Sequence, residues 1–192
     1  MSKKLQKSRI KVGAQNCHEA EIPGAFTGSV NPSMLKSVGA KYVIIGHSEN
    51  RRNGEDDKLI NRKIKTSLKM GLKVIFCIGE TLQEKRKKIT KKILSKQIKD
   101  GLRNIKTKKN IIIAYEPVWA IGTGLIPKIK DLFLIVAFIK KRMKNVKILY
   151  GGSVNPKNIQ QLKIIDNIDG FLVGGASQDS KKFIDIIKKT YN

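Results

Sequence analysis

The chain has 192 residues, of which 40% are hydrophobic and 29% are charged; this composition excludes a disordered protein and suits one globular domain over residues 1–192. Its 40 lysines and arginines outnumber 15 acidic residues and give a net charge of +25, which predicts non-specific attraction to polyanions and is uninformative about the fold. The longest apolar run, residues 132–139, is less than half of the roughly 20 residues in a membrane-spanning helix, so no membrane partner is expected.

Six short apolar runs, rich in β-branched residues, recur along the chain. They are almost continuously apolar, as expected of parallel strands covered on both faces. The predicted strands are residues 10–15, 41–46, 73–78, 111–116, 147–152 and 169–174. Stretches that permit a helix follow them, and the predicted helices are residues 32–38, 57–70, about 84–105, 128–145, 156–165 and 179–190. Asn31-Pro32 and Asn155-Pro156 are predicted helix starts, because proline suits a first helical turn.

Six strand–helix units allow either an open doubly wound sheet or a (β/α) barrel. Polar, charged or glycine residues follow nearly every predicted strand, as GAQN, GHSE, IGE, EP, GGS and GGA. A barrel builds its site from such loops around its whole carboxyl-terminal face. A Rossmann sheet instead favours one G-x-G-x-x-G after its first strand, and the sequence has no such motif. The loops therefore favour a barrel.

The first strand end with reactive side chains is GHSE, which follows the apolar run YVII. His47 in this position suits the polarisation of a carbonyl group or the transfer of a proton, and a hydrogen-bonded structural histidine is the equal alternative. Glu49 is a candidate for orienting its neighbours, and an exposed loop acid is the plainer interpretation.

The second is AYEPVWAIGTG (114–124), in which Glu116 ends an apolar strand. A carboxylate that is partly removed from water has a raised proton affinity and is a usable general base. Pro117 and the glycines at 122 and 124 bracket a segment suited to move as a lid, with Trp119 and Ile121 excluding water from the site. The alternative is an ordinary loop with a solvated glutamate.

The last two strands end in YGGSV (150–154) and LVGGAS (172–177). Each pair of glycines lets backbone N–H groups approach an anion, with Ser153 beside the first pair. Barrels often bind phosphate at the loops after their last two strands, although glycines also serve in tight turns. A base, a histidine, a lid and a phosphate cradle together favour proton abstraction next to the carbonyl of a small phosphorylated substrate.

These motifs together resemble the triosephosphate isomerase family, as do GAQNC (13–17) and GAFTG (24–28). The resemblance runs in order from about residue 10 to the carboxyl terminus. It implies a TIM-barrel fold and the interconversion of D-glyceraldehyde 3-phosphate and dihydroxyacetone phosphate, in glycolysis and gluconeogenesis, without cofactor or metal. It also implies that Glu116 is the base and His47 the neutral electrophile, roles that belong to the family's known chemistry.

Further roles follow from the same resemblance. Tyr150 matches a residue that helps to hold the lid closed. Substrate-binding roles are implied for Gly122, Ser153, Gly174 and Gly175, and supporting roles for Glu49, Tyr150, Trp119, Ile121 and Leu172.

The chain also departs from the family pattern. A family barrel has eight strand–helix units and about 250 residues, whereas the first unit here resembles the family's third. An N-terminal truncation is therefore expected, with loss of the family's early asparagine and lysine. Loss of one such electrostatic group costs on the order of 3–4 kcal/mol of transition-state stabilisation. The resemblance implies a homodimer, yet the loop that would face residues 24–28 of the partner lies in the missing units, which argues against dimerisation in the family manner.

Two alternatives to an active isomerase remain at this point. One is a catalytically weak or inactive remnant of the family. The remote one is a basic nucleic-acid-binding protein, although the densest basic cluster, KRKKITKK (85–92), lacks the aromatic residues that favour such binding. No specific nucleic-acid partner is therefore expected.

The histidines and cysteines bear on metal binding and location. His18 and His47 are far apart in the sequence, and Cys17 and Cys77 form no CxxC motif, so no metal site is predicted. Two unpaired thiols, together with the lack of an apolar segment behind the basic N-terminus, predict a cytoplasmic protein.

Overall fold

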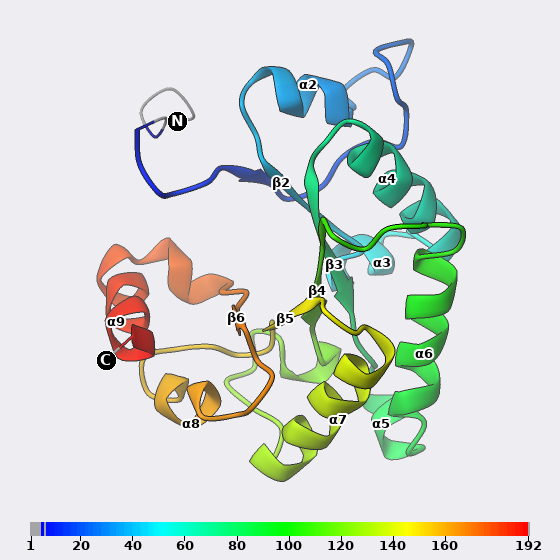
Figure 1. Cartoon of the computed structure of the whole chain (residues 1–192). Coiled ribbons are helices and arrows are strands. Elements are labelled where there is room, and N and C mark those ends of the chain that lie inside the picture. The colour runs from blue at the N-terminus through cyan, green and yellow to red at the C-terminus, as the bar shows by residue number, and fades with distance from the viewer. Residues whose placement is uncertain (1–4, 6, 192) are drawn as a thin grey trace. The chain divides into compact units, whose positions relative to one another are not determined.

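A computed structural model describes residue 5 and residues 7–191 (Figure 1). Its six strands lie in one sheet and follow one another in sequence order, from β1 to β6. The strands are β1 Gly13–Ala14, β2 Tyr42–Ile45, β3 Lys73–Ile78, β4 Ile111–Tyr115, β5 Lys147–Tyr150 and β6 Gly170–Phe171. All six predicted strands are present, and most are shorter than predicted. The pairs β1–β2, β2–β3 and β5–β6 are parallel. The strand order does not reverse at any point in the sheet. This order excludes the doubly wound sheet and confirms the barrel-type arrangement.

Eight α-helices connect or follow the strands in the described residues. They are α2 Pro32–Ser37, α3 Ser48–Arg52, α4 Asp57–Lys69, α5 Leu82–Arg86, α6 Thr90–Gly101, α7 Ile129–Arg142, α8 Ile159–Lys163 and α9 Ser180–Tyr191. The start of α2 is as predicted, because the Asn31 side chain accepts a 2.9 Å hydrogen bond from the Met34 N–H and Pro32 occupies the first turn. None of these helices is long and apolar enough to cross a membrane.

Two helix predictions are wrong in detail, and one helix was not predicted. Residues 84–105 form two helices rather than one, because Lys88 has a φ of 58° and interrupts the α-helical backbone between α5 and α6. The helix after Asn155-Pro156 begins at Ile159, since the Asn155 side chain accepts hydrogen bonds from the next N–H groups and holds a turn there. Helix α3, directly after His47, was not expected at all.

The chain divides into two compact units, here called the first unit (residues 1–77 and 96–112) and the second unit (78–95 and 113–192). In the first unit, Val43 and Ile45 of β2 and Ile60 and Ile64 of α4 are fully buried. Phe76 packs so closely against the end of α6 that a Cβ on Gly101 would overlap its ring. The packing of β2 against α4 holds the end of the strand that precedes His47.

In the second unit the core includes strand residues and buried residues of α7, α8 and α9, whereas α5 buries none. The helix α7 contains the apolar run 132–139, which buries Leu132, Val136 and Ile139. Phe133 and Leu134 of the same run are exposed by 41% and 47%, so α7 is only partly covered. Helices α8 and α9 are in contact and follow β5 and β6. Cys17 and Cys77 are both buried and lie outside any disulfide bond.

Candidate active site

His47 lies at the start of α3, immediately after β2 and the turn at Gly46. Its Nδ1 accepts a hydrogen bond of 3.3 Å from the Glu49 N–H. The exposed Glu49 carboxylate lies 3.8 Å from the same nitrogen, and an ion pair between them requires a proton on Nδ1. The backbone hydrogen bond uses Nδ1 as its acceptor and lies within bonding distance, so it favours the tautomer whose proton is on Nε2.

Arg51, which the sequence reasoning missed, holds this loop in place. Its Nε donates to the Gly46 carbonyl oxygen at 2.9 Å, and its Nη2 donates to the Cys77 carbonyl oxygen at 3.3 Å. Its Nη1 forms an ion pair of 2.7 Å with Asp57 at the start of α4. One guanidinium therefore joins the ends of β2 and β3 to a helix. In the sequence Arg51 is close to His47, four residues after it. Its partners Asp57 and Cys77 could not be inferred, because they lie 6 and 26 residues beyond Arg51.

Glu116 lies directly after β4, in the second unit, and is only 2% exposed. Its backbone N–H donates to the Ile78 carbonyl oxygen at 2.8 Å. A Cβ on Gly79 would overlap the Glu116 carbonyl, and one on Gly151 would lie 2.8 Å from the Glu116 Cγ and 3.3 Å from Oε1. Two glycines thus leave room for this residue to be buried. The alternative of a solvated glutamate is wrong.

The segment after Glu116 begins with a short 3₁₀ helix, Val118–Ala120, and ends in two glycines. Gly122 and Gly124 have φ values of 70° and 78°, which glycine adopts without strain. Trp119 and Ile121 are half-buried. The Gly124 N–H donates a 2.9 Å hydrogen bond to the Ser153 hydroxyl, so the predicted lid is joined to the predicted phosphate loop.

The other end of the lid is held by Glu80, a second residue that the sequence reasoning did not single out. Glu80 is 1% exposed and accepts 2.9 Å from the Trp119 Nε1–H and 3.1 Å from the Tyr115 hydroxyl. Its own carbonyl oxygen accepts from the Val118 N–H at 3.0 Å. Burial raises the pKa of the Glu80 carboxyl, against the opposing effect of its hydrogen bonds. The sequence could have pointed to Glu80, because it ends the motif IGE directly after a strand, as Glu116 follows the next strand.

Tyr150, at the end of β5, is fully buried, and a Cβ on Gly152 would overlap its hydroxyl. Within the described residues this hydroxyl has no hydrogen-bond partner, and burial raises its pKa. Leu172 donates its N–H to the Tyr150 carbonyl oxygen at 2.9 Å. A Cβ on Gly151 would lie 3.5 Å from the Leu172 side chain, so Leu172 supports the loop that contacts Glu116.

Gly174 and Gly175 are exposed, and a Cβ at either position would meet no atom within 4 Å. A 3₁₀ helix, Gly175–Gln178, follows, and the Gly174 carbonyl oxygen accepts from the Ser177 N–H and hydroxyl. Their backbone is thus accessible from outside the chain, as contact with an anion requires.

The predicted site residues are divided between the two units. His47 and Glu49 belong to the first unit, and the second unit holds all the others. Within the second unit, Glu116, Gly151, the lid and Ser153 are brought together. The described residues contain no group of three or more His, Cys, Asp or Glu side chains arranged to hold a metal ion.

Comparison with known proteins identifies the family. The family model described as triosephosphate isomerase matches residues 1–190. A triosephosphate isomerase from Thermodesulfovibrio yellowstonii is 48% identical over 197 residues, covering 98% of this chain and 80% of the relative. One from Carboxydothermus hydrogenoformans is 47% identical over 196 residues, covering 96% of this chain and 78% of the relative.

A solved structure gives the same answer. The crystal structure of triosephosphate isomerase from Bartonella henselae superposes with a TM-score of 0.91 at 35% identity, covering 99% of this chain and 81% of that one. The described strands are therefore those of a TIM barrel, as predicted, and the chain belongs to the triosephosphate isomerase family.

Proposed function

We propose that the chain interconverts D-glyceraldehyde 3-phosphate and dihydroxyacetone phosphate, the reaction of its family. One observation carries the proposal. The buried Glu116 carboxylate lies against Gly151, in the loop that also contains Ser153. A base that touches a phosphate loop suits a substrate in which the acidic C–H group is close to a phosphate group.

Glu116 is proposed as the base that removes a proton from the carbon next to the carbonyl group. The resulting enediolate receives that proton on the neighbouring carbon, and the hydroxyl proton passes from one of the two oxygens to the other. Together these transfers exchange aldose for ketose without net change in oxidation state. We propose that the His47 Nε2–H donates a hydrogen bond to the substrate oxygen on which negative charge develops. The Nδ1 acceptor bond supports this role, because it leaves the proton on Nε2. Glu49 supplies the N–H of that bond.

The phosphate group is proposed to bind to the backbone at Gly122, Gly174 and Gly175 and to the loop at Ser153. The open space beside Gly174 and Gly175 and the hydrogen bond from Gly124 to Ser153 support this placement. Trp119 and Ile121 would cover the reacting atoms and exclude water, which protects the enediolate from loss of its phosphate. The Tyr150 hydroxyl, with no partner in the described chain, is available for a lid N–H group.

Location and assembly are proposed mainly from the family. A cytoplasmic enzyme fits two buried thiols outside any disulfide bond. Dimerisation through the loop 24–28 has some support, because Phe26 in this loop is 47% exposed. Sedimentation of the chain with and without a Phe26→Ser change tests this contact.

The deciding experiment is an isomerase assay of the purified 192-residue chain, with Glu116→Gln as the test variant. Loss of a general base is expected to lower kcat by about 10²–10⁴-fold. Asp166→Asn, which removes an exposed carboxylate on the same unit, is the matched control and should retain wild-type activity. Equal rates in wild type and Glu116→Gln would refute the assignment. An inactive wild-type chain that is folded would support the alternative of an inactive family member.

A further inference from the structure

The second unit contains a cavity of about 230 Å³ beside the lid, here called the hinge cavity. Its apolar wall consists of Tyr115, Trp119, Pro127, Leu132, Leu134 and Ile135. None of the residues proposed to contact substrate, namely His47, Glu116, Gly122, Ser153, Gly174 and Gly175, lines it. Trp119 lies in the lid and Pro127 lies three residues beyond Gly124, so the cavity touches the chain on both sides of the lid glycines.

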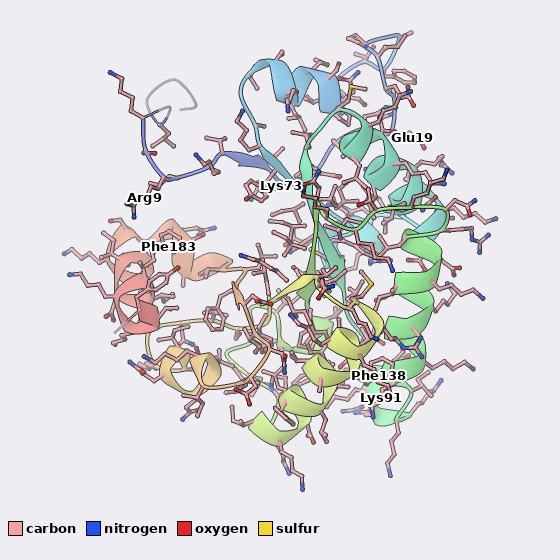
Figure 2. All side chains as sticks on the ribbon, viewed as in Figure 1. Arg9, Glu19, Lys73, Lys91, Phe138 and Phe183 are labelled. Carbon is pink, nitrogen blue, oxygen red and sulfur yellow. The ribbon has the colours of Figure 1, made fainter. Side chains whose placement is uncertain are left out.

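The hinge cavity also contains four charged side chains of both signs. Lys85 lies over the Trp119 ring, with its Nζ 3.2 Å from the ring centroid. Lys91 also lines the cavity and reaches toward Phe138 of α7, 5.6 Å from that ring centroid (Figure 2). Glu80 and Asp131 provide two carboxylates. Two lysines and a chain net charge of +25 disfavour a cationic ligand, and two carboxylates disfavour an anionic one.

Size and hydrogen bonding narrow the ligand further. A volume of about 150 Å³ is enough for a benzene-sized ring, so the hinge cavity, which is half open to solvent, has room for a single aromatic ring. Glu80 accepts one hydrogen bond from Trp119, one from its own backbone N–H, and one from the Tyr115 hydroxyl that is shared between its two oxygens. An ionised carboxylate has about four acceptor positions, so Glu80 retains capacity toward the cavity that it lines. A ligand that carries one neutral donor uses this capacity.

We infer that the hinge cavity binds a neutral, single-ring aromatic molecule with one hydrogen-bond donor, of the phenol class, and that the bound ring holds the lid in place. The ring packs against Trp119 while Trp119 remains bonded to Glu80, and its hydroxyl donates to the Glu80 carboxylate. The second half of this inference rests on the proposed role of residues 117–124 as a lid. The first half depends only on the cavity.

Binding is measured by fluorescence, because Trp119 is the only tryptophan in the chain and forms part of the cavity wall. Titration with phenol is expected to give a saturable change, with a dissociation constant on the order of 1 mM for so small a ligand. Anisole has the same ring without the donor and should bind at least about tenfold more weakly, since it cannot bond to the carboxylate. No saturable change with phenol, or equal affinity for anisole, overturns the inference.

Two variants of α7 locate the binding. Ile135→Phe fills the cavity and should abolish the phenol response. Phe133→Leu changes a partly exposed side chain of the same helix that does not line the cavity, and should leave the affinity unchanged. An unchanged response in Ile135→Phe places phenol elsewhere and refutes the assignment. If that variant fails to fold, the comparison of phenol with anisole on the wild-type chain still decides.

The effect on the lid is measured by limited proteolysis at Leu125, which is 59% exposed. Saturating phenol should slow cleavage there at least about threefold, whereas anisole at the same concentration should not. Unchanged cleavage with phenol bound refutes the holding effect. These readouts need no catalytic activity, so an inactive chain would refute the proposed function and leave this inference to its own test. In an active chain, phenol should lower kcat and leave KM for the triose phosphate nearly unchanged.

Discussion

Gly151 lies directly against Glu116, so that a Cβ at position 151 would come within 2.8 Å of the Glu116 Cγ and 3.3 Å of its Oε1. The loop after β5 and the end of β4 fit together only because residue 151 has no side chain. This contact places the proposed base beside the proposed phosphate loop, and it makes the geometry of the site sensitive to one methyl group.

A Gly151→Ala change should therefore displace the Glu116 carboxylate. A shift of about 1 Å in a catalytic group costs on the order of 10²-fold in rate, so kcat should fall by about that factor. Gly170→Ala in the same unit is the matched control, because its Cβ would meet only the end of the Leu149 side chain. Thermal unfolding of both variants separates a local displacement from general instability. Full activity in Gly151→Ala would contradict the assignment of Glu116.

Removal of the Ser153 hydroxyl should weaken the closed lid, because Gly124 loses its hydrogen-bond acceptor. One such hydrogen bond contributes about 0.5–1.5 kcal/mol. The value of kcat/KM in Ser153→Ala should therefore fall by up to about tenfold. Proteolysis at Leu125 should become faster, because the lid is less firmly held. Ser153→Thr retains a hydroxyl and should recover part of both losses. If Ser153→Ala and wild type are cleaved at the same rate, the bond does not hold the lid.

Glu80 makes stability depend on pH in a direction opposite to that of most carboxylates. Its pKa is raised in the folded chain, so the folded state favours the protonated form. The stabilising contribution is present below the ordinary glutamate pKa and is lost as the pH rises through the raised value. The free energy of unfolding of the wild type minus that of Glu80→Gln should fall as the pH rises over this window. Denaturant titrations from about pH 4 to 7 measure it, and a flat difference would contradict the raised pKa.

Arg51 is expected to matter for stability and for the position of His47. The Arg51→Met change breaks three hydrogen bonds, and we expect the free energy of unfolding to fall by about 2–3 kcal/mol. Breaking a fully buried ion pair costs about 3–5 kcal/mol, and the expected loss is smaller because the Arg51 side chain is 19% exposed. Arg51→Lys retains the charge but not the planar fork, so it should recover less than half. Chemical denaturation measures both. A loss below about 0.5 kcal/mol in Arg51→Met would show that these contacts contribute little.

Much of this molecule was readable from local patterns. Continuous apolar runs marked all six strands, because a strand covered on both faces has no polar side. The Asn31-Pro32 pair marked a helix start, because capping and a fixed proline φ act within one turn. Glu116, His47 and the glycine loops were selected as candidates for the same reason, since the residue that follows a parallel strand lies at the carboxyl-terminal face of the sheet whatever the rest of the chain does.

What the sequence did not reveal depends on contacts between distant residues. Lys88 interrupts a pattern that reads as one helix, and only the folded backbone shows its positive φ. Arg51 and Glu80 were not singled out from the sequence, because each is placed by partners that folding brings near. These partners are Cys77 and Asp57 for Arg51, and Trp119 and Tyr115 for Glu80. Apolar periodicity and turn chemistry act over a few residues and determined the strands and the site loops. Burial, hydrogen-bond partners and the space around Gly151 depend on residues far apart in the chain, and the tertiary structure alone decided them.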